Sequence, residues 1–457
     1  MFKKIKHLHL VGIGGSGMCG IAEILLNMGY TVSGSDLQNT PVTRRLEELG
    51  ARVRYGHDAR NVRGADVVVI SSAIRQENPE VAQAKQDKII IIRRAEMLAE
   101  LMRMKYGIAI AGTHGKTTTT SMVGDVLREG NLDPTVIVGG RVRSIGTGAK
   151  IGYGQYLVAE ADEFDRSFLQ LSPSIAVVTT IESEHLDCYR DIEEIKEAFI
   201  LFCNKVPFFG SSVLCGDDEA VLSILSRLDR AVITYGLNAN CDLQAREVFF
   251  AGSQSRYSAY WKGEKIGSIA LQIPGLHNVK NSLAAIVVGL ELGIPFSAVA
   301  VALERFTGVH RRFEIKGERG GVMVVDDYAH HPTEIKASLR AAKDGWNRRV
   351  VAIFQPHLYT RTQSFHQEFG QSFNDADILF VTDVYPARED PIEGVTGELI
   401  VRAARRHGMR RVEYIEKMEE IPDRVLPILE PGDIVITLGA GDIWKVGEEI
   451  YKRLPDG

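Results

Sequence analysis

Hydrophobic and polar residues follow one another in a repeating order along this chain. Short apolar runs, each suited to a buried strand, alternate with longer segments in which apolar residues return at the spacing of one helix face. Glycine, proline and charged residues separate the two kinds of segment. Strands that alternate with helices in this way form parallel sheets joined by crossover helices. The pattern therefore predicts an α/β fold.

The alternation divides into three runs, at residues 1–105, 106–309 and 310–457, and we expect each run to form a domain. The first and third runs have the pattern of a Rossmann-like, doubly wound sheet. The second has the pattern of a phosphate-loop ATPase domain, except that short alternating strands between residues 231 and 273 predict a small antiparallel patch.

The predicted elements are as follows. Strands are expected at 7–12, 31–34, 67–70, 88–92, 107–111, 156–159, 175–179, 213–215, 322–326, 350–354, 378–381 and 434–438. Helices are expected at 16–28, from Pro41, from Thr117, and at 278–292, 333–343, 363–374, 397–407 and 441–452.

Composition narrows the class of protein. The 457 residues are 45% apolar and 25% charged, with a net charge of −5, and lack the basic excess of a nucleic-acid-binding domain. No apolar run approaches the roughly 20 residues that span a membrane. The five cysteines lie far apart with no C-x-x-C pair, so neither a zinc site nor a disulfide framework is expected. We expect a cytoplasmic protein without nucleic-acid or membrane partners.

A glycine-rich loop between a buried strand and a helix is the strongest chemical signal. In that context, backbone N–H groups and a helix N-terminus converge on phosphate oxygens. Lys116 would reach the outer phosphates of ATP and Thr117 would bind Mg²⁺. One residue departs from the usual phosphate-loop pattern, because Ile110 stands where a glycine is expected. The predicted ATP-binding loop consists of Gly112, Thr113, His114, Gly115, Lys116, Thr117 and Thr118.

A second glycine turn follows the first predicted strand. It contains Gly12, Gly14, Gly15, Ser16 and Gly17, and Asp36 closes the next strand. Taken alone, this is a dinucleotide fingerprint in which the acid binds a ribose hydroxyl. The same turn can receive any diphosphate, so the motif leaves both a nicotinamide-dependent dehydrogenase and another nucleotide ligand open.

Acids and histidines follow two strands of the second run. Ligands of open α/β sheets bind beyond the carboxyl ends of the strands, and Mg²⁺ needs oxygen ligands there. The candidates are Glu160, Asp162, Glu163, Glu182, Glu184, His185 and Asp187, and for all but Glu160 a solvated loop is a serious alternative.

The third run carries two polar clusters at strand ends. Residues 326–333 contain two acids, Tyr328, His330 and His331 within a short stretch. Residues 354–362 contain His357 and Arg361, and an arginine fork at a sheet edge suits a carboxylate.

These stretches, in this order and over essentially the whole chain, resemble the Mur ligase family, which adds amino acids to UDP-linked muramic acid. Within the family, the chain most resembles the members that add L-alanine to UDP-N-acetylmuramate, because residues 12–18, 93–103 and 354–362 are nearly identical to theirs. The matching motifs are GTHGKTTTT at 112–120, AEADEFD at 159–165, EHLD at 184–187, HNVKN at 277–281, RRFE at 311–314 and DDYAHHPTE at 326–334.

The resemblance implies a role for each domain. The first would bind the UDP substrate, so that the turn of Gly12, Gly14, Gly15, Ser16 and Gly17 holds its pyrophosphate and not a nicotinamide cofactor. Ser35 and Asp36 would then contact the uridine. The second domain would bind ATP, and the third would bind the amino acid.

The resemblance also assigns individual residues. Lys116 and Thr117 would serve ATP and Mg²⁺, with Glu160 and His185 in the metal sites. Asn278 and Asn281 would flank the nucleotide, Arg312 would reach it from the hinge, and Asp327 would contact its ribose. The predicted catalytic residues are Lys116, Glu160, His185, Arg312 and His330, and the predicted alanine site consists of Tyr328, His330, His357 and Arg361.

Two residues depart from the family pattern. Thr180 stands where asparagine is usual, which puts a side-chain contact to the nucleotide in doubt. Leu358 stands where relatives often carry arginine, so Arg361 and His357 would have to bind the alanine carboxylate alone.

The implied activity is ATP-dependent ligation of L-alanine to UDP-N-acetylmuramate through an acyl phosphate, in peptidoglycan precursor synthesis. The expected ligands are ATP, Mg²⁺, UDP-N-acetylmuramate and L-alanine, and the expected assembly is a monomer or weak homodimer. A tripeptide-adding recycling ligase uses the same scaffold and is the main alternative. A dehydrogenase would leave residues 112–118 without a purpose, and a non-catalytic ATP switch would not explain the Tyr/His/Arg cluster.

Overall fold

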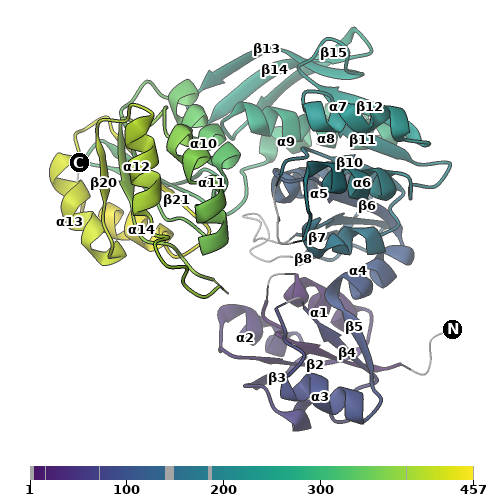
Figure 1. The fold of residues 1–457 in the computed structure, drawn as a ribbon. Coiled ribbons are helices and arrows are strands. Elements are labelled where there is room, and N and C mark those ends of the chain that lie inside the picture. The colour runs from purple at the N-terminus through teal and green to yellow at the C-terminus, as the bar shows by residue number, and fades with distance from the viewer. Residues whose placement is uncertain are drawn as a thin grey trace. The chain divides into compact units, whose positions relative to one another are not determined.

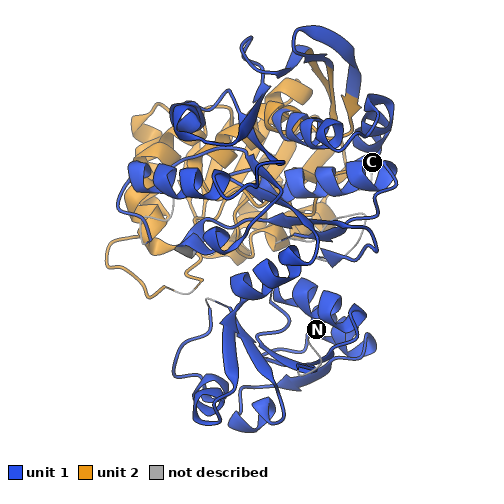
Figure 2. Ribbon diagram, turned by 90° about the vertical axis from the view of Figure 1, so that its right-hand side faces the viewer, with its two compact units in different colours: residues 1–246, 258–269, 280–306 blue, residues 247–257, 270–279, 307–457 orange. Residues whose placement is uncertain are grey.

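Three sheets organise the chain in the computed structural model, which describes residues 5–15, 17–71, 73–138, 149–183, 188–387 and 389–455 (Figure 1). Helices alternate with the strands of each sheet. The predicted α/β class, with Rossmann-like first and last domains around a phosphate-loop domain, is confirmed. The described residues gather into two compact units, and Figure 2 colours unit 1 (1–246, 258–269, 280–306) blue and unit 2 (247–257, 270–279, 307–457) orange.

The first sheet is parallel and doubly wound, with strand order β3-β2-β1-β4-β5. Its central strand β1 lies between β2 and β4, so the loop after β1 opens at the point where the chain reverses its direction of winding. The elements are β1 His7–Val11, α1 Met18–Asn27, β2 Thr31–Asp36, α2 Pro41–Glu48, β3 Arg52–Tyr55, β4 Val67–Ile70, α3 Pro79–Gln86, β5 Ile90–Arg93 and α4 Arg94–Arg103.

The second sheet has ten strands in the order β15-β14-β13-β12-β11-β10-β6-β9-β7-β8. Strand β6 has parallel neighbours on both sides, β10 and β9, and carries the glycine-rich loop at its carboxyl end. The elements are β6 Tyr106–Ala111, α5 Lys116–Glu129, β7 Thr135–Ile137, β8 Ala149–Lys150, β9 Tyr156–Glu160, β10 Ile175–Val178, α6 Ile192–Cys203, β11 Ser211–Cys215, α7 Glu219–Ile224, β12 Ala231–Gly236, β13 Leu243–Ala251, β14 Gln254–Trp261, β15 Glu264–Leu271, α8 Leu276–Glu291 and α9 Phe296–Arg305.

Two-residue turns join β13 to β14 and β14 to β15. In the second turn, Lys262 and Gly263 both have positive φ, 50° and 88°, as a tight hairpin requires. Such connections join antiparallel strands, as the predicted patch requires for β13 to β15. The prediction was wrong for residues 231–236, because β12 pairs in parallel with both β11 and β13.

The third sheet has the order β16-β17-β21-β18-β19-β20, parallel except for the edge pair β16–β17. Two hydrophobic cores include residues of this sheet. Apolar residues of α10, α11 and α12 belong to one core, and those of α13 and α14 belong to the other. The elements are β16 Glu314–Arg319, β17 Val322–Asp327, α10 Pro332–Gly345, β18 Val350–Phe354, α11 Tyr359–Ser372, β19 Ile378–Val381, α12 Glu398–Arg406, β20 Val412–Tyr414, α13 Ile421–Val425, β21 Ile434–Leu438 and α14 Trp444–Arg453.

Among the described residues, no helix combines the length and the apolar character that crossing a membrane would require. The domain limits expected after residues 105 and 309 stay predictions.

Candidate functional site

The loop after β6 has a backbone that only glycine accommodates at two positions. Gly112 has φ 125° and Gly115 has φ 81°, and a Cβ on Gly112 would lie 2.2 Å from Thr179 Oγ1. Ile110, by contrast, is a fully buried residue of β6 that pairs with Val177 of β10. The departure at position 110 therefore has a physical reason, because that residue is a strand residue and the loop begins two residues later.

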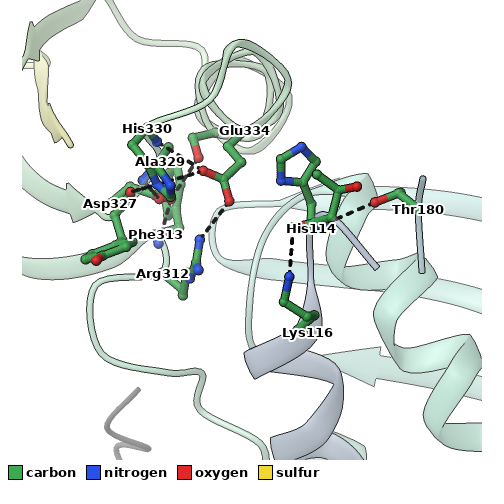
Figure 3. Close-up of polar contacts among 12 residues, drawn as sticks. His114, Lys116, Thr180, Arg312, Phe313, Asp327, Ala329, His330 and Glu334 are labelled. Atoms are coloured by element: carbon green, nitrogen blue, oxygen red, sulfur yellow. Dashed lines mark hydrogen bonds and ion pairs between the residues drawn. The ribbon is translucent and has the colours of Figure 1, made fainter. Parts of the chain in front are cut away.

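The carboxyl end of β10 fixes the loop. The N–H of Thr113 donates to Thr180 O at 2.9 Å, and the N–H of His114 donates to Thr180 Oγ1 at 3.1 Å. Thr179 Oγ1 donates to His114 O. Thr180, the residue that departs from the family pattern, therefore uses its hydroxyl to hold the loop backbone (Figure 3).

Lys116 begins helix α5 and its ammonium group lies over the loop. Its Nζ donates to Gly112 O at 2.7 Å and lies 3.0 and 2.8 Å from the two carboxylate oxygens of Glu163. Glu163 is only 2% exposed, and its own carbonyl accepts a hydrogen bond from the Tyr189 hydroxyl at 2.7 Å. Glu163 is thus no solvated loop acid but the buried counter-ion of the predicted catalytic lysine.

Oxygen donors suited to a hard cation lie near this loop. Thr117 is the second residue of α5, and Glu160 ends β9, where it pairs in register with Ile110 of β6. A hydroxyl in the first turn of α5 and a carboxylate at the end of β9 fit Mg²⁺, which prefers oxygen ligands. The other predicted metal residue, His185, lies outside the described residues, as do Glu184 and Asp187.

The two asparagines of α8 have different surroundings. Asn281 is 6% exposed and borders the loop, because a Cβ on Gly115 would lie 2.5 Å from Asn281 Oδ1. The Asn278 amide donates to Pro274 O at 2.7 Å. Their predicted contacts with the nucleotide stay predictions.

The glycine turn after β1 is held by the neighbouring strand β2. The N–H groups of Gly12 and Ile13 both donate to Ser35 O, at 2.8 and 2.9 Å, and the N–H of Gly14 donates to Asp36 Oδ2 at 2.9 Å. Gly12 and Gly17 have φ 76° and 80°, and Gly15 lies between them. Ser16 lies outside the described residues.

Arg94 is a cation beside this turn that was not singled out from the sequence. Its Nη1 lies 2.7 Å from where a Cβ of Gly17 would be, so only glycine admits the guanidinium this close. A guanidinium next to a glycine turn suits the oxygens of a diphosphate. The signal for Arg94 was its place within residues 93–103, one of the stretches that carry the family resemblance.

Ser35 belongs to a buried polar network centred on Glu80 of α3. Glu80 Oε2 accepts from Ser35 Oγ at 2.7 Å and lies 3.1 Å from His57 Nδ1, and Glu80 Oε1 accepts from Asn61 Nδ2 at 2.6 Å. Burial opposes ionisation of this carboxyl, but the nearby His9 ring, 3.7 Å away, and the hydrogen bonds from Ser35 and Asn61 outweigh it and lower the pKa of Glu80 to about 2.

In unit 2, the four predicted alanine-site residues lie together. Tyr328 and His330 follow β17, and His357 and Arg361 follow β18. The rings of Tyr328 and His330 are 5.3 Å apart, those of His330 and His357 are 5.6 Å apart, and Arg361 Nη1 lies 3.2 Å from His357 Nδ1. Tyr385, which follows β19, stacks on His357 at 5.9 Å and was not predicted.

The backbone at Leu358 explains how this cluster is built. Leu358 has φ 70° and immediately precedes helix α11, and its carbonyl accepts from the N–H and the hydroxyl of Thr362 at 3.1 and 2.8 Å. Leu358 adds no charge to this stretch, in which His357 and Arg361 are the basic side chains.

Asp327 is buried beneath the same cluster. Its carboxylate accepts from the N–H groups of Phe313 and Ala329, at 2.9 and 2.8 Å, and from Ser338 Oγ at 2.7 Å (Figure 3). Burial raises the pKa of Asp327, although Arg312 and these hydrogen bonds oppose the shift. Its predicted contact with the ribose stays a prediction.

Arg312 and His330 share one carboxylate, that of Glu334. Arg312 Nη1 donates to Glu334 Oε1 at 3.2 Å, and the N–H of His330 donates to Glu334 Oε2 at 3.0 Å. The Arg312 guanidinium also lies over the Tyr328 ring, 5.4 Å from its centroid. Sequence reasoning missed Glu334, although it closes the motif at residues 326–334.

Comparisons with known proteins agree over the whole chain. Family models match residues 7–106 (Mur ligase family, catalytic domain), 110–289 (Mur ligase middle domain) and 311–441 (Mur ligase, glutamate ligase domain). The UDP-N-acetylmuramate–L-alanine ligase of Geotalea uraniireducens is 56% identical over 454 residues, which are 99% of each chain.

Solved structures agree as well. The UDP-N-acetylmuramate–alanine ligase of Thermotoga maritima is 30% identical, with a TM-score of 0.83 over 98% of each chain. The murein peptide ligase of Psychrobacter arcticus, at 23% identity and a TM-score of 0.71 over 98% of each chain, shares the fold. On its sequence, its fold and these full-length relatives, the chain belongs to the Mur ligase family.

Proposed function

We propose that this protein joins L-alanine to the lactyl carboxylate of UDP-N-acetylmuramate and converts ATP to ADP and phosphate, a step of peptidoglycan precursor synthesis. The observation that carries the proposal is the loop at residues 112–118. Its two positive-φ glycines, its helix N-terminus and Lys116 form a phosphate-binding loop. The named activity of a relative that is 56% identical over 99% of both chains supports the same reaction.

The first step activates the carboxylate. One lactyl carboxylate oxygen attacks the γ-phosphorus of ATP, and the bond from that phosphorus to the β,γ-bridging oxygen breaks. ADP departs, and the carboxylate has become an acyl phosphate. An anion here approaches a polyanion, so charge stabilisation and positioning are the main requirements. Lys116, whose ammonium group is already held at the loop by Gly112 O, supplies positive charge.

Mg²⁺, when bound, would neutralise phosphate charge during this step. Thr117 and Glu160 would hold it, and His185 is proposed for a second metal site. Arg312, Asp327, Asn278 and Asn281 are proposed to bind the nucleotide.

The second step forms the amide. The alanine amine attacks the acyl carbon, the C–O bond to phosphate breaks, and inorganic phosphate leaves. The amine must lose a proton, and His330 is proposed to accept it, because imidazole titrates near neutral pH. Arg361 and His357 are proposed to bind the alanine carboxylate, and Tyr328 to line the same pocket.

The UDP substrate is proposed to bind the first domain, residues 1–105. The turn from Gly12 to Gly17 would receive the pyrophosphate, and Ser35 and Asp36 would contact the uridine. Residues 106–309 would form the ATP domain and residues 310–457 the alanine domain. Cytoplasmic location and a monomer or weak homodimer are part of the proposal.

Phosphate release tests the proposal. The purified chain with ATP and Mg²⁺ should release phosphate at a substantial rate only when UDP-N-acetylmuramate and L-alanine are both present. Release that requires the tripeptide and not alanine would identify a recycling ligase, and release without either acceptor would refute ligation.

A further inference from the structure

Glu334 occupies the first turn of α10 and its two oxygens serve two different groups. Oε1 accepts from Arg312 Nη1 at 3.2 Å, while Oε2 accepts from the backbone N–H of His330 at 3.0 Å and lies 3.2 Å from His330 Nδ1. Figure 3 shows the carboxylate between the guanidinium and the imidazole. The Glu334 side chain is only 11% exposed, so these contacts are weakly screened by water.

The surroundings of His330 fix which ring nitrogen carries the proton. Nδ1 lies 3.0 Å from Tyr328 O and 3.2 Å from Glu334 Oε2. A carbonyl and a carboxylate can only accept hydrogen bonds, so both contacts require a hydrogen on Nδ1. A neutral imidazole then has its lone pair on Nε2, the nitrogen that can accept a proton from an amine.

We propose that Glu334 is a positioning residue that holds His330 in the Nδ1–H form and fixes Arg312 with the same carboxylate. The inference rests on the proposed function, in which His330 is the proton acceptor of the amide-forming step. A carboxylate behind a histidine orients the ring and raises its basicity. Because one carboxylate also holds Arg312, loss of its charge should affect both proposed roles, nucleotide binding and proton transfer.

Several charged or titratable groups surround His330 in the described part of unit 2. Glu334 is the anion in contact with the ring, so its removal takes away the charge that stabilises a protonated ring. The rings of Tyr328 and His357 contact the imidazole edge-to-face. The cations are Arg312, paired with Glu334, and Arg361, 3.2 Å from His357; both favour a neutral ring.

The first experiment follows the amide-forming step in single turnovers of the full chain with both substrates, for wild type, Glu334→Gln and Glu334→Asp. For Glu334→Gln we expect a fall of about tenfold to a hundredfold in this step. The acidic limb of its pH profile should move toward lower pH, because the anion beside the ring is lost. Glu334→Asp keeps the charge and should restore part of the rate and the position of the limb. A slower step with an unmoved limb would mean a purely structural role and would overturn the inference.

A double variant tests whether Glu334 acts through His330. At saturating ATP, where weaker nucleotide binding through Arg312 has no effect, the His330→Ala, Glu334→Gln pair should form the amide no more slowly than His330→Ala alone, because Glu334 acts on proton transfer only through His330. Additive losses would overturn the inference. The matched control is Glu398→Gln, which removes an exposed carboxylate paired with Arg402 at 2.9 Å on α12 and should change neither rate nor limb.

A spectroscopic measurement observes the wild-type ring directly and uses a variant only to assign its signal. Nitrogen-15 shifts of the histidines in the wild-type chain, with His330 assigned by its absence in His330→Gln, should report hydrogen on Nδ1. Hydrogen on Nε2 would refute the inference even if ligation is intact. If wild type forms no amide from L-alanine while His330 has its hydrogen on Nδ1 and loses it in Glu334→Gln, the proposed function fails and the positioning by Glu334 stands.

Discussion

At the scale of single residues, the predicted chemistry depends on how charges are held. Lys116 is held by a backbone carbonyl and a buried carboxylate, and His330 by a carbonyl and Glu334. The sequence identified both functional groups, and it named Glu163 as a candidate acid but paired neither Glu163 with Lys116 nor Glu334 with His330. An acid at a strand end has the same sequence signature whether it faces solvent or an ammonium group, because the pairing depends on tertiary contacts between residues far apart in the chain.

Replacing Glu163 should show whether Lys116 needs only a hydrogen-bond acceptor or also a negative charge beside its ammonium group. In Glu163→Gln, an amide oxygen can still accept from the ammonium group but no longer balances its charge. We expect kcat for ATP-dependent ligation to fall about tenfold to a hundredfold, whereas Lys116→Ala should abolish ligation. Steady-state kinetics check this.

Another acid–lysine pair in unit 1 provides the control for that experiment. Glu193 lies 2.8 Å from Lys196 on α6, and its side chain is 68% exposed. Glu193→Gln should leave kcat unchanged because exposed pairs contribute little. Equal activity of the Glu163 and Glu193 variants would contradict a role for Glu163.

Arg361→Ala should mainly weaken alanine binding. Its guanidinium is the proposed partner of the alanine carboxylate, and a charged hydrogen bond contributes about 1.5–3 kcal/mol. We therefore expect the KM for L-alanine to rise about tenfold to a hundredfold while the KM for ATP stays the same. An unchanged alanine KM would remove Arg361 from the pocket.

At the scale of elements, apolar strands of four or more residues were predictable, whereas very short strands and polar edge strands were not. The limits predicted for β4, β18, β19 and β21 are confirmed to the residue, because their apolar runs are buried on both faces. Among the strands that escaped prediction, β3, β16 and β20 each lie at the edge of a sheet and are rich in polar residues, while β7 and β8 have only three and two residues. An edge strand is partly exposed, so its sequence lacks the apolar run that identifies a strand.

The link between β10 and the phosphate loop is an element-scale prediction. Thr180→Val preserves the shape of the side chain but removes the oxygen that accepts from the N–H of His114. A single hydrogen bond contributes about 1 kcal/mol, so we expect the KM for ATP to rise about fivefold. Thr180→Ser should retain wild-type kinetics. A Val variant with unchanged KM would show that this bond does not set the loop conformation.

The network beneath β1 and β2 predicts an acid-sensitive first domain. The pKa of Glu80 is about 2 in the folded chain, below its ordinary 4.5, so the unfolded chain binds the proton more tightly. The stability it contributes is complete above pH 4.5 and is lost as the pH falls toward 2, to an extent on the order of 3 kcal/mol.

Urea unfolding of the first domain at several pH values between 5 and 3 checks this. The wild-type midpoint should fall with pH more steeply than that of Glu80→Gln, which has no carboxyl to protonate. Parallel slopes for the two proteins would contradict the low pKa.

At the scale of the whole molecule, the account makes one chemical claim. The loop at residues 112–118 serves to turn a carboxylate into an acyl phosphate that an amine can attack. This claim goes beyond ATP hydrolysis, because it requires that an oxygen atom of the sugar substrate leave as part of the phosphate.

Oxygen-18 transfer tests that claim most directly. UDP-N-acetylmuramate labelled in both lactyl carboxylate oxygens is incubated with the enzyme, ATP, Mg²⁺ and L-alanine. The masses of the released phosphate and of the amide product are then measured by mass spectrometry. The account predicts one labelled oxygen in each phosphate released and one in the new amide. Amide formed with unlabelled phosphate, or phosphate released without amide, would contradict it.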